Sequence, residues 1–171
     1  YMSKYLLEMN LRYDGSSKFR PENRWDFFYG FSGGWRLSEE EFMKNVKFVN
    51  ELKLRLSYGV VGNQSGISRY DGMQLYNFNS VNGAYIGDGR ISYIKTSGEI
   101  ATMGRSWERI HNYNLGLDFH LFDSRLQGTV ELFMKKNNNM LIAVAYPGIL
   151  GDKAPASNSG KFEAKGYEGT V

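Results

Sequence analysis

Three neighbouring carboxylates, Glu39, Glu40 and Glu41, could suggest acid–base chemistry. Hydrolysis of a glycosidic bond needs two carboxyl groups that face each other across the substrate. Adjacent residues do not offer that geometry, whereas Ser38 followed three residues later by a glutamate is a capping-box pattern. Carboxylates also suit the positive end of a helix. We therefore expect a short helix near residues 39–48, in which these carboxylates cap the first turn.

The two histidines, His111 and His120, are the other candidates for acid–base or metal chemistry. They lie nine residues apart in one extended run, so they point to opposite faces of a strand, about 30 Å apart, and cannot share a zinc ion. The absence of cysteine excludes disulfides, a thiolate metal site and a cysteine nucleophile. Asp71 and Asp88, each followed by glycine, lack the ligand spacing of a calcium loop. We expect no catalytic residue, no metal site and no cofactor.

Aromatic and arginine side chains in one long segment are the best candidates for contact with a ligand. The segment from Gly62 to Arg105 is rich in glycine and has no sustained hydrophobic period. A loop of this length usually has a function or is disordered. Its tyrosines could stack on sugar rings and its arginines could hold polar groups, or both could fasten the loop to its neighbours. The candidates are Arg69, Tyr70, Tyr76, Tyr85 and Arg90.

The composition of the 171 residues indicates an all-β protein. Basic residues number 21 and acidic residues 18, and the basic ones do not cluster, which argues against a nucleic-acid partner. Aromatic residues make up 15%, and 20 glycines stand against 3 prolines, as expected for strands joined by long loops. No run of about 18 apolar residues exists, which excludes a transmembrane helix but not the strands of a membrane barrel.

Strict alternation identifies the strands, most clearly between Leu52 and Val60. Leucine, tyrosine and valine fill the even positions there, and lysine, arginine, serine and glycine fill the odd ones, so one face of the strand is apolar and the other polar. The strands expected are at about Tyr5–Tyr13, Trp25–Arg36, Leu52–Val60, Trp107–Leu121 and Leu126–Lys136, with a sixth beginning at Gly166.

The connections between these strands alternate in length. Those after the third and fifth strands are long, the one after the second is short, and the one after the fourth is a tight turn. The second long loop covers about residues 137–165, although Met140 to Tyr146 has the pattern of a short strand. Long loops at one end and short turns at the other are typical of up-and-down outer-membrane barrels.

The positions of tyrosine and tryptophan favour lipid over a protein core as the neighbour of the apolar faces. Tyr5 and Tyr13 end the apolar face of the first strand, and Trp25 and Trp35 end that of the second. Eight to ten residues at ~3.3 Å each, tilted by ~40°, span about 20–25 Å, close to the ~25 Å apolar band of such barrels. Tyrosine and tryptophan prefer the borders of that band because the ring is apolar and its polar group stays wet.

These patterns assign side chains to two faces of a transmembrane barrel. Those expected to face lipid are Tyr5, Leu7, Met9, Leu11 and Tyr13 in the first strand, Leu52, Leu54, Leu56, Tyr58 and Val60 in the third, and Leu115, Leu117 and Phe119 in the fourth. Those expected to face the lumen are Arg12, Lys53, Arg55, Asn114, Asp118 and Glu131.

Seven short motifs follow one another along nearly the whole chain. They are Asp14-Gly-Ser-Ser-Lys-Phe19, Gly34-Trp-Arg-Leu-Ser-Glu-Glu40 with Phe42, Leu52-Lys-Leu-Arg-Leu-Ser-Tyr-Gly59, Gly62-Asn-Gln64, Trp107-Glu108, Asn114-Leu-Gly-Leu-Asp-Phe119, and Asn158-x-Gly160 with Gly166-x-Glu168. No single motif is specific, but their order resembles the C-terminal barrel region of SusC/RagA-type TonB-dependent transporters of Bacteroidota.

The resemblance implies a barrel of roughly 22 strands with an N-terminal plug in its lumen. It also implies a SusD-like surface lipoprotein as partner, energy supplied through the TonB complex, and import of oligosaccharides or peptides, without enzymatic activity. Residues 1–171 would then be part of the barrel domain, and the plug would lie outside this chain. The lumen-facing polar side chains would anchor that plug.

Two other functions fit parts of the pattern. A soluble β-sandwich that binds carbohydrate or mediates adhesion also has one apolar face per strand, and it predicts that the chain folds in water without detergent. A glycosidase would need a sugar-cleaving activity that disappears when Glu39 or Glu41 is replaced.

Overall fold

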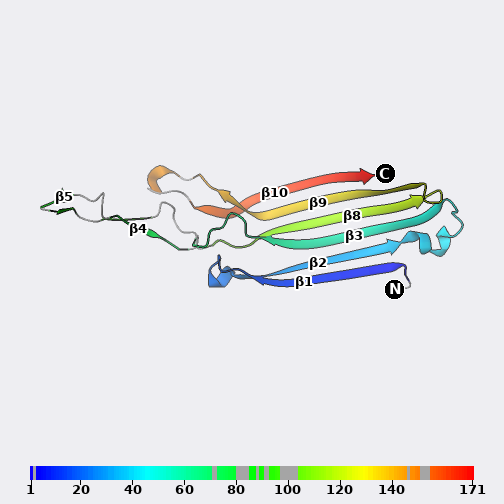
Figure 1. Ribbon diagram of the computed structural model, residues 1–171, viewed down its shortest axis with the longest axis horizontal. Helices are drawn as coiled ribbons and strands as arrows, with labels where there is room; N and C mark the ends of the chain where they lie inside the picture. The colour runs from blue at the N-terminus through cyan, green and yellow to red at the C-terminus, as the bar shows by residue number, and fades with distance from the viewer. Residues whose placement is uncertain are drawn as a thin grey trace.

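The six long strands lie side by side in one antiparallel sheet, which is extended at one end by narrower ribbons (Figure 1). Each strand pairs with the long strand that precedes it, so the topology is up-and-down, as expected. No helix in the described part of the chain is long and apolar enough to cross a membrane. This computed structural model describes residues 1, 3–70, 73–79, 85–87, 89–90, 93–96, 104–145, 147–150 and 155–171.

The sheet follows the alternation of the sequence closely. Its strands are β1 (Tyr5–Gly15), β2 (Trp25–Arg36), β3 (Val49–Asn63), β8 (Glu108–Leu121), β9 (Leu126–Ala143) and β10 (Ala156–Thr170). Two short ladders interrupt the connection after β3, namely β4 (Tyr76–Asn79) with β7 (Tyr93–Thr96), and β5 (Tyr85–Ile86) with β6 (Gly89–Arg90). Single 3-10 turns lie at η1 (Pro21–Asn23), η2 (Leu37–Glu39), η3 (Glu41–Met43) and η4 (Gly148–Leu150).

The helix expected near residues 39–48 is not formed. Two 3-10 turns, η2 and η3, lie there instead, and Glu40 between them is extended, with φ −77° and ψ 150°. Neither turn has a side-chain cap, so the capping box predicted from Ser38 and Glu41 is absent. Extended backbone at Glu40 directs its carboxylate to the ends of β1 and β2, and those contacts outweigh the local preference for a helix.

The last two strands are longer than the sequence pattern predicted. β9 continues to Ala143, so most of the strand pattern at Met140–Tyr146 belongs to it. β10 begins at Ala156, ten residues before the predicted start at Gly166, and its pairing with β9 is irregular around Gly160. Register shifts interrupt the two-residue period of a strand, which is why alternation did not reveal this part of β10.

The two ends of the sheet differ in their connections. The turn end holds both chain termini, the β2–β3 connection and the four-residue β8–β9 turn (Figure 1). Three residues of that turn, Phe122, Asp123 and Ser124, have positive φ values of 53°, 55° and 61°. The loop end carries the three other connections, at residues 16–24, 64–107 and 144–155. The predicted separation of short turns from long loops is therefore confirmed.

Buried apolar side chains gather at the loop end. Trp107 packs against Phe19 and, edge to face, against Phe28, with ring centroids 5.1 and 5.4 Å apart. Val60 and Ile67 complete this loop-end cluster. The prediction that Val60 faces lipid is wrong, because its side chain is only 6% exposed within the cluster.

Candidate functional site

The register of the sheet places the apolar side chains of different strands in rows on one face, called here the apolar face. One row runs from Leu7 on β1 through Gly33, Leu56, Leu115 and Leu132 to Tyr167 on β10, each residue directly opposite the next. Leu7, Leu56 and Tyr167 are 87%, 62% and 84% exposed, so the chain itself does not cover this face. The side chains predicted to face lipid, Val60 excepted, share it: Tyr5, Leu7, Met9, Leu11, Tyr13, Leu52, Leu54, Leu56, Tyr58, Leu115, Leu117 and Phe119.

Aromatic side chains mark the border of the apolar face nearest the loop end. Tyr13 stacks on Trp25, with ring centroids 5.3 Å apart, and Tyr58 contacts Tyr113 with centroids 4.8 Å apart. On β10 the border residue is Tyr167. The row of paired residues that contains Tyr167 meets β1 at Leu7, whereas the border residue of β1 is Tyr13, six residues further along. The aromatic border therefore crosses the sheet diagonally.

The aromatic border has the slope that a flat boundary would have if it crossed a sheet of tilted strands. Strands ~4.8 Å apart with a rise of ~3.3 Å per residue, tilted by ~40°, shift a horizontal line by about 1.2 residues per strand, or about six residues over five steps. Beyond the border the same face becomes polar, with His111, Lys136 and Glu163 in one row and the last two joined by an ion pair of 3.2 Å.

The opposite, polar face holds an ion-pair network that joins three strands. Arg55 on β3 donates to both carboxylate oxygens of Asp118 on β8, at 2.7 and 2.9 Å, and to Glu131 on β9 at 2.6 Å. Asn114 donates to the second oxygen of Glu131 at 3.2 Å. Gly116 makes room for the guanidinium, since a Cβ there would lie 2.9 Å from Arg55 Nη2. Four of the six predicted lumen residues therefore form one satisfied network.

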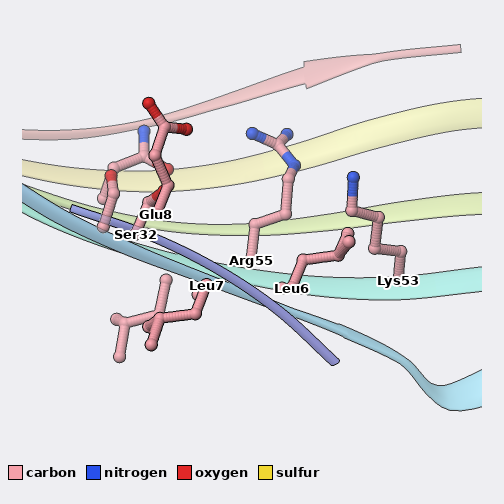
Figure 2. A pocket seen from close by; sticks show the side chains of 11 residues that line it. Leu6, Leu7, Glu8, Ser32, Lys53 and Arg55 are labelled. Carbon is pink, nitrogen blue, oxygen red and sulfur yellow. The ribbon is translucent and has the colours of Figure 1, made fainter. Parts of the chain in front are cut away.

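The other two predicted lumen residues lie apart from this network. Arg12 forms an exposed ion pair of 2.6 Å with Asp14 on the same strand. Lys53 makes no ion pair within the described ranges, and it lines a shallow groove of about 650 Å³ that Glu8 and Arg55 also line. Figure 2 shows these three side chains rising from one side of the sheet. The groove offers charges of both signs to whatever lies against it.

The acidic side chains of the polar face are already engaged by neighbouring donors. The carboxylates of Asp118 and Glu131 accept hydrogen bonds from Arg55 and from uncharged donors. Among the described residues, no group of three histidine, aspartate or glutamate side chains could hold a metal ion. Asp71 and Asp88, considered above as calcium ligands, lie outside the described residues.

The structure spreads the five predicted ligand residues along the β3–β8 connection. Arg69 and Tyr70 are exposed near its start, and Tyr76 is exposed on β4. Tyr85 and Arg90 are direct backbone partners in the β5–β6 ladder, and their side chains lie outside the described part. Arg69 lines a cavity against the β1–β2 loop.

A buried carboxylate to which the sequence analysis assigned no role holds the loop end together. Glu108 is 7% exposed and accepts hydrogen bonds from Asn63 at 2.9 Å, Asn137 at 3.2 Å and the backbone N–H of Leu141 at 2.6 Å. Asn158 on β10 likewise bonds both backbone groups of Ser106. Three of these side chains lie in the motifs noted above, but only the fold shows that the motifs meet.

Glu40 has a corresponding role at the turn end. Its carboxylate accepts hydrogen bonds from the Tyr5 hydroxyl at 2.7 Å, the Trp35 indole at 3.0 Å and Lys4 at 3.2 Å. These bonds, that from Tyr5 first, hold the pKa of Glu40 below its ordinary value. The carboxylate thus ties the β2–β3 connection to two strands and is not set up as a general acid.

Comparisons with known proteins point to one family. The model described as "TonB dependent receptor-like, beta-barrel" matches residues 1–171. The chain is 35% identical to the TonB-dependent receptor P39 of Formosa agariphila and 32% identical to the TonB-dependent receptor SusC of Bacteroides thetaiotaomicron. These alignments cover 100% and 99% of this chain, but only 16% and 17% of the relatives.

Solved structures give the same result. The chain matches the RagAB peptide transporter with a TM-score of 0.79 and 29% identity, over 97% of this chain and 18% of that one. It matches the RagAB peptide importer in the open-open state with a TM-score of 0.81 and 28% identity, over 97% and 17% of the two chains.

Proposed function

Because this chain belongs to the TonB-dependent receptor β-barrel family, we propose that it forms part of the wall of a transporter that imports nutrients across the outer membrane. Proteins of this family are outer-membrane transporters rather than enzymes. In this role the chain supplies a surface and has no chemistry of its own. Energy reaches the transporter through TonB, which contacts a part of the protein outside these residues.

The diagonal aromatic border is the observation that carries the membrane placement. In our proposal the apolar face meets lipid, Tyr13, Trp25, Tyr58, Tyr113 and Tyr167 lie near the outer interface, and the loop end extends outside the cell. The soluble sandwich considered above needs a second sheet over the apolar face. The described strands form one six-stranded sheet and two two-stranded ladders, and this supports the membrane placement.

We propose that the polar face supports the plug that fills the lumen. The pairing of Arg55 with two carboxylates suits a stiff wall, because its charge is already balanced by neighbouring strands. Lys53 and Glu8 on the groove are better suited to bind the plug, since neither forms an ion pair with the network in the described ranges. The sequence predicted that Arg55 anchors the plug. In this proposal Arg55 instead holds the neighbouring strands of the wall together.

In this proposal both the partner and the substrate bind at the loop end. A SusD-like lipoprotein covers it from outside the cell, and the ligand passes between the two. Arg69, Tyr70, Tyr76, Tyr85 and Arg90 are the candidates for ligand contact. One matched structure is a peptide importer, and the resemblance carried by the motifs implies oligosaccharides or peptides, so both ligand classes are candidates for this transporter.

Uptake by cells that carry the complete transporter tests this function. Labelled oligosaccharides and peptides are offered to cells with an intact TonB system and to cells that lack it. We expect accumulation of one ligand class only in the cells with TonB, with equal amounts of the protein in both outer membranes. Recovery of the protein in the soluble fraction, or uptake that does not depend on TonB, would contradict the proposal.

A further inference from the structure

A small cavity at the loop end carries an excess of positive charge. It has a volume of about 310 Å³ and lies between the β1–β2 loop and the first residues of the β3–β8 connection. Phe19 and Met73 give it an apolar wall. Its cationic lining, called here the basic pocket, consists of Lys18, Arg20, Arg24 and Arg69.

Within the described part of the chain, three of the four cations have no acidic partner. Arg20 is paired with Glu22 at 2.9 Å, whereas Lys18, Arg24 and Arg69 make no ion pair within the described ranges. The Nε atom of Arg24 is buried and has no hydrogen-bond acceptor there. A buried donor without an acceptor is costly, and neighbouring cations destabilise one another. One bound anion would relieve the repulsion between these cations.

We propose that the basic pocket binds the carboxylate group of an acidic ligand on its way into the transporter. A guanidinium forms paired hydrogen bonds with such groups, which Arg24 and Arg69 could supply from opposite loops. The volume is near the lower limit for ligand sites, so it holds one sugar ring or one acidic amino acid. The inference rests on the proposed function only for placing this pocket at the outer mouth.

Binding to the detergent-solubilised complete transporter tests the pocket by isothermal titration at low salt. The probes are glucuronate against glucose, and the acetylated, amidated dipeptide Glu-Glu against its Gln-Gln counterpart. We expect one acidic probe to saturate while its neutral counterpart does not, and binding to weaken as salt is added. Preference for glucuronate identifies a sugar acid as the source of the anion, and preference for Glu-Glu identifies an acidic peptide.

Substitutions locate the binding within the molecule. Arg69→Gln and Arg24→Gln are each expected to weaken the acidic probe about tenfold, the loss of one charge-assisted hydrogen bond. Arg125→Gln is the matched control, because it removes the same charge from an exposed site at the turn end. Arg69 is exposed, so its variant remains informative if Arg24→Gln does not fold.

Two outcomes would contradict the proposal that the basic pocket binds an acidic ligand. One is that neither acidic probe saturates, and the other is that Arg125→Gln weakens binding as much as Arg69→Gln. Both outcomes leave the proposed import function unaffected, because the titration does not measure uptake. Conversely, loss of TonB-dependent uptake in a protein that still binds glucuronate would count against the proposed function alone.

Discussion

On the polar face, individual side chains link neighbouring strands of the sheet. Arg55 binds Asp118 and Glu131 across three strands, and each carboxylate has a further uncharged donor. Without the guanidinium, two negative charges would face each other with little compensation. The network is only partly exposed, so it is worth more than a surface ion pair and less than a fully buried one.

Replacing Arg55 by glutamine should therefore lower the free energy of unfolding by about 2 kcal/mol. Urea unfolding of the complete barrel from lipid vesicles measures this change. Arg12→Gln is the control, because Arg12 also pairs with an acid on this face but is largely exposed, and its loss should cost no more than about 0.5 kcal/mol. Equal effects of the two substitutions would show that the network does not stabilise the wall.

Glu108 is the second residue whose contribution can be measured. Glutamine in its place would keep the size but turn an amide group toward donors from Asn63, Asn137 or Leu141. We expect Glu108→Gln to lower stability by about 1–3 kcal/mol, the cost of an unsatisfied buried group. The exposed Glu22→Gln should be nearly neutral in the same unfolding experiment. A neutral Glu108→Gln would mean that the loop end does not depend on this carboxylate.

At the scale of elements, the β2–β3 connection shows how tertiary contacts override a local pattern. Ser38 and Glu41 predict a capped helix, yet the chain forms two 3-10 turns around an extended Glu40. The decisive hydrogen-bond donors are Tyr5 and Trp35, of which Tyr5 lies 35 residues away in the sequence. A local pattern contains no information about such partners.

The Glu40 contacts predict a pH dependence of stability. The folded state holds the pKa of Glu40 below its unfolded value, so this stabilisation is present above the ordinary pKa of glutamate and is lost as the pH falls through the folded pKa. Urea midpoints measured from pH 7 down to pH 3 should therefore decrease less for Glu40→Gln than for the unchanged protein. Glu41→Gln, at an exposed site, should keep the original slope, and identical slopes for all three proteins would contradict this role.

The sequence predicted strands well wherever alternation was regular, and for a physical reason. Side chains of β3 and β8 alternate because one face is apolar and the other polar. From Lys53 to Tyr58 each apolar or aromatic residue of β3 pairs with a residue of the same character on β8. The first half of β10 was missed because its register shifts near Gly160 disturb the two-residue period. The burial of Val60 and Glu108 depends on loops that are distant in sequence, and alternation does not show those contacts.

At the scale of the whole molecule, the sheet has two open edges, β1 and β10. Unpaired edges of this length invite association with further strands, and in the proposed function the rest of the barrel supplies them. In that proposal the apolar face is one sector of a cylinder that meets lipid, and its diagonal aromatic border is a section of the membrane interface. The matched relatives are about six times longer than this segment, consistent with such a sector.

The most direct test of this account compares two residues that lie on opposite faces of β3. Leu54 lies on the apolar face four residues from the border residue Tyr58, and Ser57 lines the groove on the polar face. In a complete barrel refolded into vesicles, Leu54→Arg should cost ~2–4 kcal/mol, as expected near the bilayer midplane, and Ser57→Arg should cost less than about 1 kcal/mol. A near-zero cost for Leu54→Arg, or an equal cost for both, would contradict the placement of the apolar face in lipid.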